Sequence, residues 1–205
     1  MKTKSLRNLF ALILLFSINS YAEQDSIALE TVGPAIKKTK KMHTLQIAAG
    51  LSALSSNLSA QSGVSYSIDY FYAFKPQWAA VVSAGQGLNT GLQVLTTDIS
   101  AALAYAWKGS HTAEKLEVAN EGQIIANIDP LPQEAWIITA GIKQNFFNGT
   151  ETVLPLTGPT FSLIKRFPSA SNQNAIVGGA LDYTFNGDNT LTAVKLFVGA
   201  NFPVF

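Results

Sequence analysis

The amino-acid sequence predicts an all-β fold, an eight-stranded antiparallel up-and-down transmembrane β-barrel. Many segments alternate between large apolar side chains and small or polar ones, which is the period of a β-strand with two different faces. Charged residues make up only 13% of the 205 residues, about half of the roughly 25% that is typical of soluble domains. The chain has no cysteine, so no disulfide contributes to its stability. Together these features indicate that one face of each strand meets lipid.

The N-terminus predicts export. Basic residues open the chain, an apolar run follows at residues 9–16, and the small residues Ser20 and Ala22 occupy the two positions that a signal peptidase reads. The apolar run is well short of the roughly 20 residues that a membrane-spanning helix needs. We therefore expect a cleaved signal peptide at residues 1–22.

The mature chain divides into a leader at residues 23–42 and one barrel domain at residues 43–205, with a long insert at residues 108–134. Lys2, Lys4 and Arg7 leave with the signal peptide, so 11 Lys and Arg remain against 13 Asp and Glu. A net charge near −2 gives no indication of a nucleic-acid partner.

Four strands are predicted in the first half of the barrel, at residues 45–53, 64–74, 78–84 and 99–107. Each carries apolar side chains on one face and small or polar side chains on the other. The alternative is a soluble lipocalin-like barrel or sandwich, whose outer face would carry many Lys and Glu. The fourth strand instead has Ser and Ala at its polar-face positions, which suits a narrow lumen better than a wet surface.

Four more strands are predicted in the second half, at residues 136–143, 160–167, 177–185 and 191–205. Asn186 and Gly187 are a strong hairpin signal between the last two strands, and a two- or four-residue loop there keeps both apolar faces on one side. In the last strand, Pro203 predicts a bulge or kink because proline cannot donate to the ladder.

Aromatic residues cluster at one end of the predicted strands. Tryptophans lie beside the turn at residues 75–77 and at both ends of the insert. Aromatic rings with polar atoms prefer the membrane–water interface, so we expect one aromatic girdle there. Its predicted members are Tyr70, Tyr72, Phe74, Trp78, Tyr105, Trp107, Trp136 and Phe202.

Charged residues inside the predicted strands fall mostly on the lumen-facing parity. They are Asp69, Asp98, Lys143, Arg166, Asp182 and Lys195. Buried charges need partners, so we expect a salt-bridge network that fills the lumen. A narrow pore through this network is an alternative. Lys165 has the opposite parity and is expected to extend its ammonium group to an interface.

This strand pattern resembles that of the small outer-membrane β-barrel proteins of Gram-negative bacteria, the eight-stranded OmpA/OmpX type, over roughly residues 43–205. The resemblance implies an outer-membrane location and contact with outer-membrane lipids. It also implies that the terminal aromatic residue, Phe205, is the signal read by the barrel-assembly machinery.

Two segments fall outside the predicted barrel. The leader contains Lys37, Lys38, Lys40 and Lys41, which suits a solvated and partly disordered segment, or contact with anionic headgroups or an acidic partner. The insert at residues 108–134 is acidic and long for a periplasmic turn, and residues 116–128 inside it predict a small hairpin beyond the barrel rim. The insert is a candidate for binding a partner protein, or an extracellular loop if the polarity of the barrel is inverted.

Catalytic chemistry has little support in the sequence. The two histidines, His43 and His111, form no metal-binding pair, and no nucleophile motif or phosphate loop appears, so we expect no metal and no cofactor. A lipid-modifying barrel enzyme is the alternative, with His111 paired to Ser110 at a lipid-facing rim. We therefore expect a non-enzymatic outer-membrane barrel with a structural or interaction role.

Overall fold

The computed structural model describes residues 35–56, 60–89, 94–120, 123–128, 134–148, 155–168, 173–187 and 189–204. The expected signal peptide and the assembly signal Phe205 lie outside these residues. The regular elements in the described part of the chain are eleven β-strands. No helix among the described residues is long and apolar enough to cross a membrane.

Eight of the strands close into an antiparallel barrel in the order β10-β11-β2-β3-β4-β5-β8-β9. These strands are β2 (His43–Ser56), β3 (Ala60–Lys75), β4 (Trp78–Asn89), β5 (Val94–Lys108), β8 (Ala135–Asn148), β9 (Leu156–Phe167), β10 (Asn174–Asn186) and β11 (Asn189–Val204). The predicted fold class and strand count are confirmed. The strands run for 12 to 16 residues, longer than predicted, because pairing continues beyond the alternating apolar segments to both rims.

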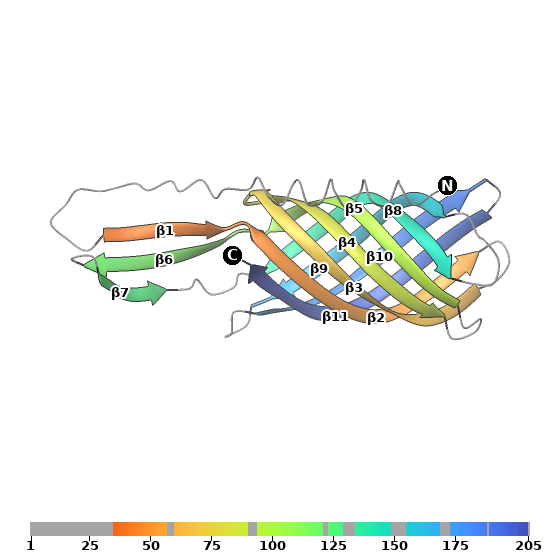
Figure 1. Cartoon of the computed structure of the whole chain (residues 1–205), viewed down its shortest axis with the longest axis horizontal. Coiled ribbons are helices and arrows are strands. Elements are labelled where there is room, and N and C mark those ends of the chain that lie inside the picture. Colours follow the sequence, from red (N-terminus) through yellow and green to blue (C-terminus); the bar gives the residue numbers. More distant parts are fainter. Residues whose placement is uncertain are drawn as a thin grey trace.

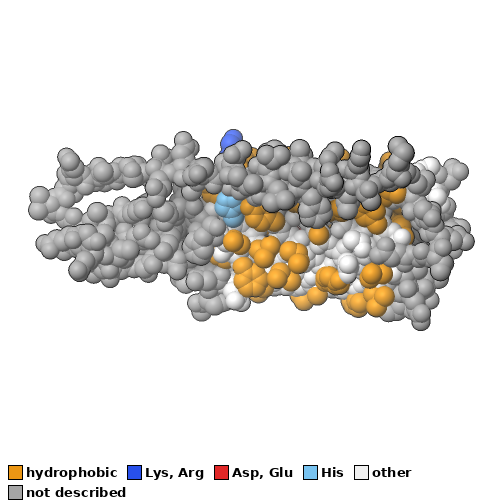
Figure 2. All heavy atoms as spheres, viewed as in Figure 1, with side chains coloured by type: hydrophobic (Ala, Val, Ile, Leu, Met, Phe, Trp, Pro, Cys, Tyr) orange, Lys and Arg blue, Asp and Glu red, His pale blue; other side chains and the backbone are white. Residues whose placement is uncertain are grey.

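The barrel carries its large apolar side chains on the outside. Leu51, Leu196 and Ile142 are 68%, 67% and 64% exposed, and every barrel strand contributes residues of this kind. Hydrophobic side chains cover much of the coloured barrel wall in Figure 2. The lumen is lined by small and polar residues, most of them buried. This is the reverse of a soluble barrel, in which the apolar face is inside.

One apolar layer lies within the lumen, toward the end of the barrel at which its first strand begins. Phe71 and Ile137 are among its fully buried residues, and Phe197 packs against it. The ring of Phe197 covers Gly178, where a Cβ atom would lie 2.5 Å from the ring. Only glycine leaves space for this ring, so Gly178 permits the aromatic residue to fill the lumen.

The turns explain the strand register. Asn186 pairs with Asn189 across a two-residue connection, and Gly187 has a φ of 59°, which this tight hairpin turn requires. The prediction of a bulge at Pro203 is wrong, because the β11–β2 ladder keeps its register through Pro203 and Val204. A proline this near a strand end costs the ladder at most one hydrogen bond. The register shifts lie instead between Ala73 and Lys75 and between Ala106 and Lys108.

A second sheet extends beyond one end of the barrel, with the order β1-β6-β7 (Figure 1). Its strands are β1 (Ala35–Lys41), β6 (Ala113–Asn120) and β7 (Gln123–Ile128). The hairpin β6–β7 lies in the insert, where the sequence predicts one. Residues 35–41 of the leader are a strand and not a disordered segment. In the β1–β6 register, Lys37 is opposite Glu117 and Lys40 is opposite Glu114.

Candidate functional site

Four lumen charges form one compact ion-pair cluster, which we call the lumen cluster (Asp98, Lys143, Asp182 and Lys195). Lys143 Nζ lies 2.8 Å from Asp182 Oδ2 and 3.6 Å from Asp98 Oδ1. Lys195 Nζ lies 3.0 Å from Asp98 Oδ2 and 3.6 Å from Asp182 Oδ2. Each lysine therefore contacts both aspartates, and the cluster is neutral as a whole.

The lumen cluster joins strands on different sides of the barrel. Asp98 is on β5, Lys143 on β8, Asp182 on β10 and Lys195 on β11, so the Lys143–Asp182 and Lys195–Asp98 pairs link strands that are not neighbours in the sheet. Thr160 Oγ1 donates a further hydrogen bond of 2.6 Å to Asp182 Oδ1. These side chains reach across the lumen from four strands.

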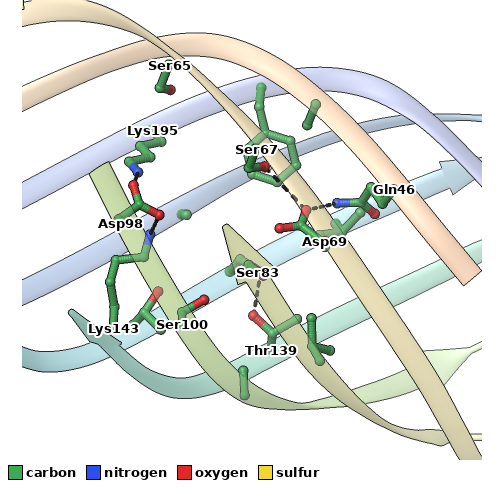
Figure 3. A pocket seen from close by; sticks show the side chains of 18 of the residues that line it. Gln46, Ser65, Ser67, Asp69, Ser83, Asp98, Ser100, Thr139, Lys143 and Lys195 are labelled. Carbon is green, nitrogen blue, oxygen red and sulfur yellow. Dashed lines mark hydrogen bonds and ion pairs between the residues drawn. The ribbon is translucent and has the colours of Figure 1, made fainter. Parts of the chain in front are cut away.

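Asp69, which the sequence assigns to the same network, lies apart from the lumen cluster. Its carboxylate accepts hydrogen bonds from Gln46 Nε2 at 2.8 Å and from Ser67 Oγ at 3.4 Å (Figure 3). Neutral donors thus replace the expected ion pair. The reason is register, because Asp69 faces Gln46 on β2 and Ser83 on β4 and has no basic residue opposite it.

A cavity of about 80 Å³ lies between Asp69 and the lumen cluster. Serine and threonine side chains line much of its wall, and Asp69, Asp98, Lys143 and Lys195 reach it (Figure 3). This volume holds a few water molecules and is far below the roughly 300 Å³ at which small-molecule pockets begin. The described lumen is therefore a hydrated polar core rather than a ligand pocket.

Arg166 lies at the other end of the lumen, beneath a short stretch of the insert that we call the mouth segment (residues 109–112). Arg166 Nη1 donates a hydrogen bond of 3.2 Å to the carbonyl oxygen of Ser110. The mouth segment is held against the β3–β4 turn, because the His111 N–H and the Ser110 hydroxyl both donate to Pro76 O, at 2.7 and 3.0 Å. Arg166 is thus separate from the lumen cluster, contrary to the expected single network.

His111 points into the barrel mouth and is only 3% exposed. Its ring stacks on Phe71 with 6.0 Å between the centroids. Burial, together with the nearby positive charge of Arg166, lowers the pKa of His111 to about 4, so the ring is neutral at pH 7. Sequence reasoning placed this residue in a flexible insert, and no local signal marks it as a buried residue.

The arrangement does not form the Ser–His pair that a lipid-modifying enzyme would need. The Ser110 hydroxyl contacts Pro76 O and Thr112, and neither ring nitrogen of His111 has a hydrogen-bond partner among the described residues. The ring is inside the lumen and not at a lipid-facing rim. In addition, no group of three acidic or histidine residues in the described part of the chain could hold a metal ion.

The predicted girdle residues lie around the rim from which the second sheet extends. Trp78 contacts Tyr105 at 4.8 Å between centroids, and Trp107 stacks on Trp136 at 5.7 Å. Lys165 Nζ lies 5.0 Å above the Trp136 ring. The remaining members are outward-facing and half-buried or exposed, namely Tyr70, Tyr72, Phe74 and Phe202.

The barrel fold recurs among solved structures. Residues covering 80% of this chain superpose on 99% of Neisserial surface protein A (NspA), with a TM-score of 0.56 and 12% sequence identity. The N-terminal β-barrel domain of Pseudomonas aeruginosa OprF aligns with a TM-score of 0.48 and 12% identity, over 80% of this chain and 100% of the domain. No protein-family model and no curated protein sequence matches the chain. The likeness to NspA is one of fold.

Proposed function

We propose that this chain is an outer-membrane β-barrel protein of a Gram-negative bacterium, with a structural or interaction role and no catalytic activity. The observation that carries this proposal is the inverted distribution of side chains in a closed barrel. Large apolar residues cover the outer wall while charged residues are buried in the lumen. In water such a continuous apolar surface would cause aggregation, whereas in lipid it lowers the free energy of insertion.

We propose an orientation for the barrel from its even strand number and a periplasmic N-terminus. With eight strands, the first barrel strand starts and the last one ends at the same rim, and in an exported chain we assign this rim to the periplasm. The connections at the opposite rim are short, from two to seven residues between consecutive strands. The β1-β6-β7 sheet then projects into the periplasm.

We assign the interaction role to this sheet. It is the largest part of the described chain outside the barrel, and it combines a basic strand, β1, with the acidic strand β6 and the uncharged strand β7. Sheet edges recruit extended segments of partner proteins, because unpaired backbone N–H and C=O groups favour a further strand. The partner is then a periplasmic protein, while lipids contact only the barrel.

Membrane fractionation combined with heat-modifiability tests this assignment. The protein should be recovered in the outer-membrane fraction, and its mobility on a gel should differ between unheated and boiled samples, because the closed barrel resists detergent until it is heated. The same sample denatured beforehand in urea is the control and should show only the mobility of the boiled form. Recovery in the soluble fraction, or a mobility that is independent of heating, would contradict the proposal.

A narrow pore is a second candidate that one observation favours. The cavity between Asp69 and the lumen cluster has room for water within the barrel. Against conduction stands the lumen cluster, whose four charges cross the barrel and contact one another directly. We therefore rank a closed lumen above a pore.

A further inference from the structure

Arg166 has a different environment from every other charged residue that faces the described lumen. The lumen cluster contains two lysines and two aspartates in mutual contact, and Asp69 is surrounded by neutral hydrogen-bond donors. Arg166 is only 5% exposed, and no carboxylate among the described residues forms an ion pair with it. A buried guanidinium without a counter-charge is strongly unfavourable, because burial removes most of its hydration.

The orientation of the Arg166 side chain is determined by one hydrogen bond. Nη1 donates to Ser110 O, and the mouth segment that provides this oxygen is itself bound to Pro76. Nε and Nη2 are both buried, and neither has a hydrogen-bond partner among the described residues. One edge of the guanidinium is therefore used and the opposite edge is free.

The free edge has a defined chemical preference. The N–H groups of Nε and Nη2 lie side by side and point in the same direction, so they form a fork that matches two oxygen atoms of one planar or tetrahedral anion. Carboxylate, phosphate and sulfate provide two such oxygens, and chloride does not. Water can accept hydrogen bonds from both groups, but it does not neutralise the charge.

Further unpartnered polar groups lie at the same end of the lumen. Asn174 and Asn201 are directly opposite each other on β10 and β11, and Asn174 is two residues from Ile176, the register partner of Arg166. Asn201 is 1% exposed, and its Nδ2 has no hydrogen-bond partner among the described residues. Its register partners have buried oxygens that also lack a partner, Asn174 Oδ1 and Gln46 Oε1, so this amide does not by itself indicate an anion.

We propose that the barrel mouth contains an oxyanion-binding site in which Arg166 binds two oxygens of a carboxylate, phosphate or sulfate group through Nε and Nη2. The mouth segment positions the guanidinium through Ser110 O. The site is distinct from the lumen cluster, which is neutral and has its charges paired. It also does not depend on which side of a membrane the mouth faces.

The test is equilibrium dialysis of the folded, detergent-solubilised protein against radiolabelled sulfate at constant ionic strength. The parent should bind one sulfate per chain, and unlabelled phosphate or acetate should displace it while chloride should not. Arg166→Gln should lose this binding. The matched control is Lys165→Gln, which removes a positive charge from the neighbouring outward-facing position and should bind like the parent.

Arg166→Lys separates fork recognition from charge. A lysine keeps the positive charge but offers no fork, so this variant should bind sulfate at least tenfold more weakly and should lose the discrimination against chloride. This variant and the competition series on the parent also decide the question if Arg166→Gln fails to fold. The proposal is overturned if the parent binds no sulfate, if chloride competes as well as phosphate does, or if Arg166→Gln binds like the parent.

Discussion

The outward-facing apolar side chains make the barrel stable in a lipid bilayer, and single residues among them test this. Leu103 is 53% exposed on β5, and Ile138, on β8, faces the same way. Replacing either with Arg should cost about 2 to 4 kcal/mol of folding free energy in a bilayer, because a charge would face the hydrocarbon. The measurement is folding into lipid vesicles, followed by heat-modifiability, with Leu103→Ala as an apolar control. Unimpaired folding of both Arg variants would show that these positions do not face lipid.

Lys143 and Asp69 should respond differently to the loss of charge. Lys143→Met leaves two buried aspartates with only Lys195 between them, so we expect a loss of about 3 kcal/mol in the free energy of unfolding. Asp69→Asn should cost only about 1 kcal/mol, because Asp69 forms no ion pair and an amide still accepts hydrogen bonds. Urea titrations of both variants in detergent measure the two losses, and the loss for Lys143→Met should be the larger. Equal losses would mean that Asp69 is coupled to the lumen cluster.

His111 should make stability depend on pH. Its pKa is about 4 in the folded protein and near its ordinary value of 6.5 in the unfolded chain, so between these values the unfolded state binds more protons. Stability should therefore decrease as the pH falls from about 6.5 to about 4, by at most about 3 kcal/mol from this residue. Unfolding measured across this range in chloride buffers should show a smaller decrease for His111→Gln. Parallel curves would mean that the ring is accessible to water.

The sequence predicts the face on which a strand residue lies better than it predicts the contacts of that residue. Alternation alone places Asp69, Arg166 and Lys143 on the lumen side, because the period of a strand is a local property. Their partners depend on strand register and on the tilt of the barrel, which local pattern does not contain. For this reason the six charges appeared as one network, whereas the structure separates Asp69 and Arg166 from the other four.

At the scale of elements, the barrel and the second sheet differ in how their strands can be recognised. The barrel strands have regular alternation and turn signals, so their existence and order are predictable from the sequence. Strand β1 is a run of lysines with no such pattern, and it forms because β6 supplies a ladder more than 70 residues away. Pairing over such distances is a tertiary effect that overrides local propensity.

The hairpin β6–β7 should be dispensable for the barrel. Replacing residues 113–128 with a short Gly-containing turn keeps the mouth segment and its contacts with Pro76 and Arg166. We expect a folded, heat-modifiable barrel that no longer contacts its partner, measured by crosslinking in cells. A larger deletion of residues 109–132 also removes the mouth segment, and it should yield a less stable barrel. Loss of barrel assembly in the smaller deletion would show that the second sheet is part of the fold.

At the scale of the whole molecule, the lumen cluster predicts a barrel that does not conduct ions. Its four side chains span the lumen, and the cavity beside them has a volume of only about 80 Å³. Protein reconstituted into planar bilayers should therefore give no steady current above the lipid background. The matched variant pair Lys143→Met and Asp69→Asn shows whether any current depends on the lumen. Steady single-channel steps from the parent would favour the narrow pore.

The pairing of β1 with β6 has a consequence for the order of assembly. Both strands belong to the first 120 residues, whereas barrel closure pairs β2 with β11, which lies at Asn189–Val204. The second sheet can therefore form before closure, and it then links the chain ahead of β2 to the chain behind β5. Such a link shortens the flexible chain between β2 and β11. Barrel closure therefore costs less conformational entropy. We expect the second sheet to hold the first four barrel strands together before β11 pairs with β2.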